Sequence, residues 1–448
     1  MIDTGLYTIY IVKRLCFSWK EKGMATLAQL LMAATLILML LGRTPLYTTA
    51  VIGSTLAALV FGIPVLAEDG ATSLKELVLG GLNPVIADMA GVLLFIGVME
   101  YAGYLNVLVN AIIRVGNRLG GGPGVAVAGG FGAGVIGGFT GFTQPAITAV
   151  VTGPASVKLG VNPSQSAGTH AHAGHLGNFA GFTHPTLLAV MALVGIKFGA
   201  INLIGLVTAS TIFAVSFIRM RASLKATKSD AKSAGLNALE GFARKEGEPS
   251  VWFVLLPFVL LVIGFSLGYP VFLVGFAVSI LVMLLARLNP MEAEASMLES
   301  VKRVAVPLIA TVSFLFMSGV IKAVGITELL ADWFSPALNA APILTVAIIS
   351  AIAGLLTQSN SASAAIILPF VSLALETGDV NALALAAAAC GPTAVMQYFL
   401  TGGPVAALAT TVPVVPGSDL KEANKFQRPS QLAGLAVVIL IAVLIGGF

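Results

Sequence analysis

Long apolar runs are the feature that most constrains how this chain can fold. The clearest are Leu27–Leu41, Tyr47–Leu66, Pro84–Leu105, Thr186–Phe217, Val251–Leu267 and Pro270–Leu285. A helix needs about 20 apolar residues to cross a bilayer. Of the 448 residues, 57% are apolar and only 10% are charged, whereas a soluble domain carries roughly 25% charged residues. The sequence therefore predicts an all-α polytopic membrane protein embedded in a lipid bilayer.

The composition also excludes several classes of protein. The formal charge of +4 comes from scattered lysines and arginines, and no basic run with interleaved aromatics indicates a nucleic-acid partner. A phosphate-binding P-loop is absent, so the chain has no ATP motor of that kind. Cys16 and Cys390 lie far apart and form neither a disulfide framework nor a CxxC site. We predict no cofactor and no enzymatic activity.

A polar segment divides the chain into two halves. Residues 218–250 are polar, and seven basic residues lie between Arg219 and Lys245. We interpret this segment as a linker between a first repeat, 27–217, and a second repeat, 251–448. Residues 1–26 form an N-terminal extension in this scheme, and its basic residues before Met24 do not belong to a clear signal peptide.

Four motifs of the first half recur in the same order in the second. The pairs are LGRTP and LGYP, LLFIGVMEYAGYLNVL and FLFMSGVIKAVGITELL, TQPAITAVVTGP and TQSNSASAAIILP, and FTHP and LTGGP. Their spacing is nearly constant, since Thr357 lies 214 positions after Thr143 and Pro270 lies 225 positions after Pro45. Self-similarity at such a spacing predicts a structural repeat.

The distribution of charge indicates that the repeats are inverted. If each half crosses the membrane an odd number of times, the linker shares one face with most of the lysines and arginines. The positive-inside rule puts that face in the cytoplasm and both termini outside. We therefore predict a multi-pass protein of the cytoplasmic (inner) membrane, in which linker 218–250 is cytoplasmic. Inverted repeats that carry matched helix-breaking stretches are typical of secondary transporters.

Two polar stretches interrupt helices inside the apolar regions. Gly141–Pro145 and Thr357–Ser361 each break a helix and restart one, with Pro145 and Ser359–Ser361 suited to a first helical turn. The restarted helix presents free N–H donors and a partial positive charge, which suit a carboxylate. The alternative is a tight seam between packed helices. The candidate substrate residues at these breaks are Thr143, Gln144, Pro145, Gln358, Ser359, Asn360, Ser361 and Ser363.

Further polar residues lie between the paired motifs of each half. Asn178 and Thr183 follow the first break, and Thr393 and Gln397 follow the second. Their neutral amides and hydroxyls either contact oxygen atoms of a substrate or bridge helices.

All four histidines lie in one stretch of the first half. His170, His172, His175 and His184 allow three interpretations. They are structural, they bind substrate or a coupling proton near neutral pH, or the first three bind a metal in a membrane-embedded enzyme. The metal interpretation lacks acidic or cysteine partners in the sequence. We expect His184 and His175 to be the ion-coupling residues.

Four charged residues interrupt apolar segments. Asp88, Glu100, Lys197 and Lys322 are functional candidates, because a charge at the bilayer centre costs roughly 2.5–3.5 kcal/mol on insertion scales. Glu100 is the third ion-coupling candidate. Asp88 and Lys197 can instead extend to the membrane surface. Lys322 either attracts an anion or pairs with an acid.

The two breaks resemble the motifs of a known family. GFTQPAITAVVTGPASVKLGVNP is similar to the GFGTP-type segment of the lactate permease family, and TQSNSASA resembles its second-half TGSN-type signature. The pattern also resembles the wider ion-transporter superfamily of gluconate and citrate permeases. The chain has Thr-Gln where that family tends to have Gly-Thr, and Gln358 replaces a glycine.

The resemblance implies an inverted-repeat carrier that takes up small organic acids, usually with protons. It places Thr143, Gln144 and Pro145 in the first substrate motif and Ser359, Asn360 and Ser361 in the second. We therefore predict a symporter for a small carboxylate, which works by alternating access with a proton as the coupling ion. Sodium coupling, a channel and the metal-dependent enzyme are the alternatives, and a homodimer is possible for a carrier of this kind.

Overall fold

The computed structural model describes residues 4–41, 44, 46–66, 72–81, 84–140, 143, 145–226, 246–267, 269–302, 305–378, 380–400 and 407–447. The described part of the chain is helical, and five of its helical stretches are long and apolar enough to cross a membrane. They are Gly23–Leu41, Tyr104–Phe139, Pro163–Val194, Ala200–Leu224 and Leu420–Gly446. The protein is thus a multi-pass membrane protein, as the apolar runs predict.

The helices of the first half can be matched in order with those of the second. The first half consists of α1 (Thr4–Leu41), α2 (Leu46–Phe61), α3 (Leu74–Gly81), α4 (Pro84–Tyr101), α5 (Tyr104–Thr140), α6 (Ala146–Lys158), the series α7 (Pro163–Ala171), α8 (Ala173–His175) and η1 (Leu176–Ala180), then α9 (Pro185–Val194) and α10 (Ala200–Ala226). Their counterparts in the second half, in the same order, are α11 (Val251–Ser266), α12 (Val271–Leu285), α13 (Pro290–Lys302), α14 (Ala305–Ala323), the pair α15 (Ile326–Ala340) and α16 (Pro342–Thr357), α17 (Asn360–Glu376), α18 (Ala382–Met396), the pair α19 (Ala407–Thr411) and η3 (Val412–Val414), and α20 (Leu420–Gly446).

Each half contains a helical hairpin before its break. Helix α5 folds back on itself at Gly121, whose φ of 56° lies in the left-handed region that glycine adopts without strain. Its two arms touch at Gly116 and Gly124, where a side chain on either residue would strike the backbone of the other. In the second half, Ala341 makes the corresponding turn between α15 and α16.

The last helices of the two halves pack against each other in opposite directions. Along α10, Ile212 contacts Gly434 of α20, and Ser216 Oγ lies 2.8 Å from Ser430 Oγ. Further along α10, Arg219 Nη1 donates to the carbonyl of Phe426. Residue numbers rise on one helix as they fall on the other, so these equivalent helices are antiparallel. This is the arrangement that an inverted repeat requires.

Helices of each half also pack directly against helices of the other half. Helix α4 of the first half packs on α12 and α13 of the second, and α14 of the second packs on α2 and α3 of the first. Gly91 of α4 lies very close to α12, because a side chain there would strike the backbone of Val271 and Phe272. The two halves are therefore interlocked rather than separate units.

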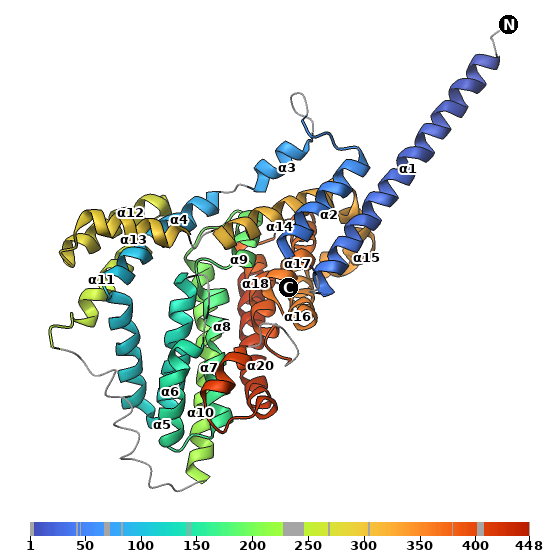
Figure 1. Ribbon diagram of the computed structural model, residues 1–448. Coiled ribbons are helices and arrows are strands. Elements are labelled where there is room, and N and C mark those ends of the chain that lie inside the picture. The colour runs from blue at the N-terminus through green and yellow to red at the C-terminus, as the bar shows by residue number, and fades with distance from the viewer. Residues whose placement is uncertain are drawn as a thin grey trace.

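Helices run across two of the predicted boundaries. Helix α1 runs without interruption from Thr4 through residue 26 into the first apolar segment, and the N-terminal end of α1 projects from the bundle (Figure 1). The predicted linker 218–250 begins inside α10, which continues to Ala226. Near the end of the linker, Glu248 pairs with Arg114 of α5 at 2.9 Å.

Candidate functional site: two helix breaks joined by buried amides

The first break lies between α5 and α6. Gly141, Phe142 and Gln144 are outside the described residues. Helix α6 restarts after Pro145, whose φ of −58° and ψ of −28° suit a first helical turn. The Thr143 side chain sits between Gly137 of α5 and Gly177 of η1, where a Cβ on either glycine would collide with its Oγ1. The predicted restart is confirmed, and two glycines shape the space around it.

The second break lies between α16 and α17. Helix α16 ends at Thr357, and Gln358 then adopts a left-handed conformation with φ of 49°. A left-handed conformation costs a non-glycine residue about 1 kcal/mol or more. Ser359 is extended, and its Oγ accepts a hydrogen bond from Ala362 N at 3.3 Å, as expected of an N-cap. This break, too, is confirmed.

Asn360, the first residue of α17, contacts segments of both halves. Its backbone N–H donates to Gln397 Oε1 at 2.9 Å, and its Nδ2 lies 3.2 Å from His184 Nδ1. Its carbonyl accepts a hydrogen bond from Thr186 Oγ1 at 2.8 Å. The FTHP motif of the first half therefore contacts the broken helix of the second.

These contacts modify the expected anion site. The main-chain donors of Asn360 and Ala362 are already bonded to Gln397 and Ser359. A carboxylate at α17 would therefore meet the helix end through its remaining donors and through the side chains around it. The positive end of the helix persists, because the aligned peptide dipoles do not depend on which group accepts the hydrogen bonds.

A short series of contacts joins the first break to the second. Gly177, which packs on Thr143, precedes Asn178 in the π-helical segment η1. Asn178 Nδ2 donates to Tyr398 Oη at 2.9 Å. Tyr398 follows Gln397, which holds the start of α17 through Asn360. Single π turns inside helices are frequently found at functional sites.

Several buried oxygen atoms around the second break have no hydrogen-bond partner among the residues that the structure describes. They are Thr183 Oγ1, Gln358 Oε1, Asn360 Oδ1 and Thr393 Oγ1. An unpaired buried polar group costs about 1–3 kcal/mol. Oxygen atoms left in this state are ready to accept hydrogen bonds or to ligate a cation.

The remaining predicted residues of α17 and α18 are buried close by. Ser363 Oγ donates to the carbonyl of Ser359 at 2.9 Å, so it helps to hold the cap. Ser361 is half-buried in the first turn of α17. Thr393 packs closely on Gly354 of α16, and its N–H donates to Ser350 Oγ at 3.1 Å.

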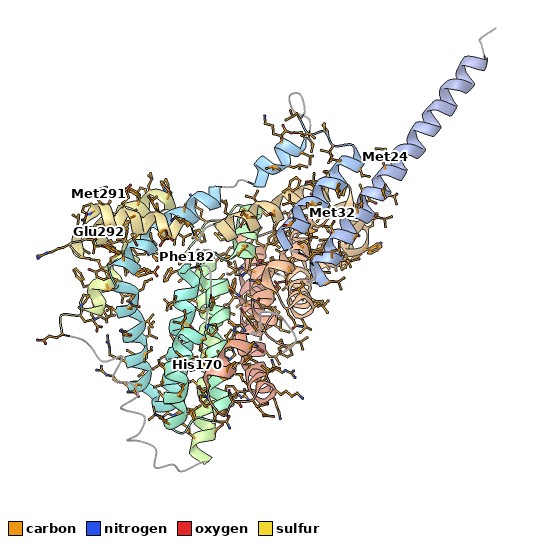
Figure 2. The ribbon with its side chains drawn as sticks, in the orientation of Figure 1. Met24, Met32, His170, Phe182, Met291 and Glu292 are labelled. Atoms are coloured by element: carbon orange, nitrogen blue, oxygen red, sulfur yellow. The ribbon has the colours of Figure 1, made fainter. Side chains whose placement is uncertain are left out.

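The first three histidines do not form a metal site. Residues two apart on a helix point roughly 200° apart, and the rings of His170 and His172 accordingly reach Thr152 and Ser216 on different helices. Among the described residues, no three His, Cys, Asp or Glu side chains are placed to hold a metal ion. The positions of these rings therefore give the metal alternative no support. His170 is fully buried, and in the view of Figure 2 it lies lower in the helical bundle than Phe182.

The charged candidates lie away from the breaks. Glu100 is exposed near the C-terminal end of α4, so its predicted role as proton carrier has no support in the fold. Lys322 pairs with Glu376 at 2.6 Å, and both side chains are largely exposed. Lys197 is exposed in the loop before α10. The side chain of Asp88 is outside the described residues.

Sequence reasoning missed Tyr398 and the polar face of α20. On α20, Asn424, Gln427 and Gln431 are each no more than 1% exposed. Their spacing of three and four residues is that of one helix face, and amides on a buried face were the signal that could have revealed them. No comparable sequence pattern points to Tyr398.

Taken together, the helices define an all-helical membrane-transporter fold. Two solved structures are similar over almost their whole length. One is the YdaH transporter of Alcanivorax borkumensis, described as having an unusual topology, with 16% sequence identity and a TM-score of 0.56 over 93% of this chain and 98% of that one. The other is MtrF of Neisseria gonorrhoeae, described with a class of antimetabolite efflux pumps, with 14% identity and a TM-score of 0.58 over 93% and 95%.

These likenesses establish the fold. The structures that share it are transporters, not enzymes. A scan against protein-family models and a search of the curated proteins find no match. The resemblance to the lactate permease family stays a prediction.

Proposed function

We propose that this protein is a secondary transporter that carries a small organic anion across the bilayer together with a proton. The observation that carries the proposal is the meeting of the second broken helix with the first half at Asn360, inside a transporter fold. The two repeats move relative to each other in this scheme and open the site to each side in turn.

The charges of the site suit an organic anion. The starts of α6 and α17 contribute the positive ends of two helices. Gln397, Asn178 and His184 contribute neutral polar groups, and the described contacts of Asn360 include no carboxylate that would repel an anion. The lactate-permease-like motifs favour a monocarboxylate.

The unpaired oxygens favour a substrate that also carries hydroxyl groups. A carboxylate cannot donate to Gln358 Oε1 or Asn360 Oδ1, whereas the hydroxyl of a hydroxy acid can. This supports hydroxy acids such as lactate or gluconate over a simple fatty acid. Ser361, in the first turn of α17, would contact the carboxylate end.

Sodium coupling is the second candidate, and the same unpaired oxygens favour it. Hydroxyl and amide oxygens such as those of Thr183 and Asn360 are ligands for a hard cation. Replacing sodium by choline in a transport assay separates the two. Transport that is unchanged in choline supports the proton, and loss of transport in choline supports sodium.

The direction of transport is open to the same assay. One of the solved structures with this fold is described with antimetabolite efflux pumps, so we include export as well as uptake.

We place the protein in the cytoplasmic membrane with the polar segment 218–250 inside. A cysteine introduced into that segment should react with an impermeant maleimide only after the cells are opened.

Transport by purified protein in liposomes tests the proposal directly. Labelled lactate, gluconate and citrate are offered with and without an inward proton gradient. We expect gradient-driven accumulation of at least one, with lactate or gluconate ahead of citrate. Equilibration without uphill accumulation would indicate a channel. The absence of both accumulation and exchange for all organic anions would contradict the proposal.

A further inference from the structure

His172 and His175 form a buried pair immediately before η1. Both residues are at most 2% exposed, and their ring centroids are 5.2 Å apart. His172 Nε2 lies 2.9 Å from Ser216 Oγ, and His175 Nδ1 lies 3.3 Å from the carbonyl of His172. The other nitrogen of each ring, His172 Nδ1 and His175 Nε2, is buried without a partner among the described residues.

His170, in the same stretch, is different. Its Nδ1 lies 2.8 Å from the carbonyl of Ser166, and its Nε2 lies 2.7 Å from Thr152 Oγ1. Both ring nitrogens are therefore engaged. A structural histidine is expected to look like this, so the contrast marks the other two as unusual.

Helix α20 faces this region with acceptor atoms of its own. Gln427 Nε2 donates to the carbonyl of Gly168 at 2.9 Å, and Gln431 Nε2 donates to the carbonyl of Tyr398 at 3.1 Å. The Oε1 atom of each glutamine is buried and has no described partner. These amides contact α7, which ends immediately before His172, and Tyr398, whose ring lies beside that of His175.

One added proton would change what the ring of His175 can do. When His175 carries its single proton at Nδ1, which faces the carbonyl of His172, Nε2 is a basic nitrogen that can bind a second proton. That second proton would turn Nε2 from an acceptor into a donor. We propose that the His172–His175 pair binds the coupling proton of this transporter, an inference that rests on the proposed function.

The pair is connected to the substrate site through Tyr398. The rings of His175 and Tyr398 have centroids 5.0 Å apart. Tyr398 Oη accepts from Asn178, which adjoins the first break, and the preceding residue Gln397 holds Asn360 at the second. A shift of Tyr398 when His175 gains a proton would therefore reach both breaks.

On its other side, the pair continues into a series of hydroxyl groups. His172 contacts Ser216 Oγ, and Ser216 Oγ lies 2.8 Å from Ser430 Oγ across the α10–α20 interface. A hydroxyl can accept a proton on one side and donate one on the other. Ser216 and Ser430 would serve as the route by which the proton reaches the pair.

The charges around the pair limit it to one proton. The ionisable groups on the surrounding elements are Tyr398, the buried Cys390 of α18, His170 of α7 and Arg219 of α10. Helix α20 contributes the neutral Gln427, Ser430 and Gln431. The guanidinium of Arg219 lies 4.5 Å from the centre of the Phe426 ring. Two charged imidazoles at this separation would repel each other strongly in a low-dielectric interior.

Histidine NMR on the full chain in lipid nanodiscs tests the proposal without a substrate. The protein is labelled with ¹⁵N-histidine and titrated from about pH 8 down to about pH 4, because burial disfavours the charged form of a histidine. His172→Gln keeps a polar atom at the Nε2 position, and His175→Asn keeps one at Nδ1. His170→Asn and His184→Asn are the matched controls. We expect one histidine signal to titrate, and to vanish or shift in His172→Gln and His175→Asn but persist in both controls.

Transport provides the second readout. In liposomes, we expect His172→Gln and His175→Asn to retain exchange of labelled lactate or gluconate without a pH gradient, and to lose about tenfold or more of the gradient-driven accumulation that a proton adds. The proposal would be overturned if no histidine titrated, if the titrating signal survived both substitutions, or if both variants stayed fully gradient-driven. If the unmodified protein exchanged no organic anion at all, the proposed function would fail, while the titration would still judge the proton site.

Discussion

The two helix breaks occupy equivalent places in the repeat, yet they are built differently. At the first, Pro145 restarts the helix, and glycines pack around the Thr143 side chain. At the second, Gln358 takes a strained conformation and Asn360 makes three contacts with other segments. The difference indicates that the two halves share the position of the helix break, whereas the side chains at the break have different roles in each half. In this account, the first break fixes geometry and the second contacts the solute.

Replacing Asn360 should give the largest effect. Asn360→Ala removes the contact with His184 and an unpaired oxygen of the site, and each buried hydrogen bond is worth about 1–3 kcal/mol. We therefore expect transport in liposomes to fall by about 10- to 100-fold.

Asn381 offers a matched control for that change. It caps α18, where its side chain accepts from Ala384 N at 3.0 Å. Asn381→Ala should lower stability by about 1 kcal/mol and leave the transport rate of the folded protein unchanged. Equal losses of transport in the two variants would contradict the special role of the second break.

The first break should respond to crowding rather than to loss of a polar group. Gly177→Ala would place a Cβ against Thr143 Oγ1, and overpacking typically costs about 1–3 kcal/mol. We expect a lower melting temperature together with reduced transport.

Removing the obstacle should reverse that effect. Thr143→Ala in the same chain takes away the colliding hydroxyl, so it should restore most of the stability lost in Gly177→Ala. Gly23→Ala is the control, because open space surrounds that position of α1. If the double variant were no more stable than Gly177→Ala, the packing account of the first break would be wrong.

Gln358 allows strain and chemistry to be separated. Gln358→Gly relieves the left-handed conformation and should stabilise the protein by about 1 kcal/mol, while it removes the unpaired Oε1 and lowers transport. Gln358→Ala loses the same oxygen but keeps the strained backbone. It should therefore transport poorly without the gain in stability that Gln358→Gly brings. Arg287→Gly, at the other non-glycine residue with positive φ among those described, should stabilise without affecting transport. Unimpaired transport by Gln358→Gly would remove this residue from the site.

The exposed ion pair of Lys322 and Glu376 should matter least. Both partners are largely exposed, and such pairs contribute about 0–1 kcal/mol. We expect Lys322→Met to change stability and transport very little. A loss of transport comparable to that of Asn360→Ala would show that this lysine attracts the substrate after all.

The sequence predicted the fold well, because its signals are periodic and strong. Apolar runs gave the helices, and matched motifs indicated the repeat that α10 and α20 display. The breaks were predictable because Pro145, Ser359 and their neighbours are direct signals of helix restarts.

The partners of the site residues could not be predicted in the same way. The contact between Asn360 and Gln397 depends on how α17 meets the segment after α18, and nothing local records it. Glu100 shows the same limit, because an acidic residue inside an apolar run can lie at the exposed end of its helix. The spacing of the histidines was no guide to a metal site, because residue spacing alone does not specify which helix each ring faces.

Protection of a single introduced cysteine by the substrate tests the central claim most directly. Ser361→Cys places a thiol in the first turn of α17, where Ser361 is half-buried, in a chain that carries Cys16→Ser and keeps the buried Cys390. If this turn of the second break contacts the solute, the transported anion at saturation should slow the reaction of the introduced thiol with a small maleimide by about tenfold or more. A reaction rate that is the same with and without the transported anion would contradict the account.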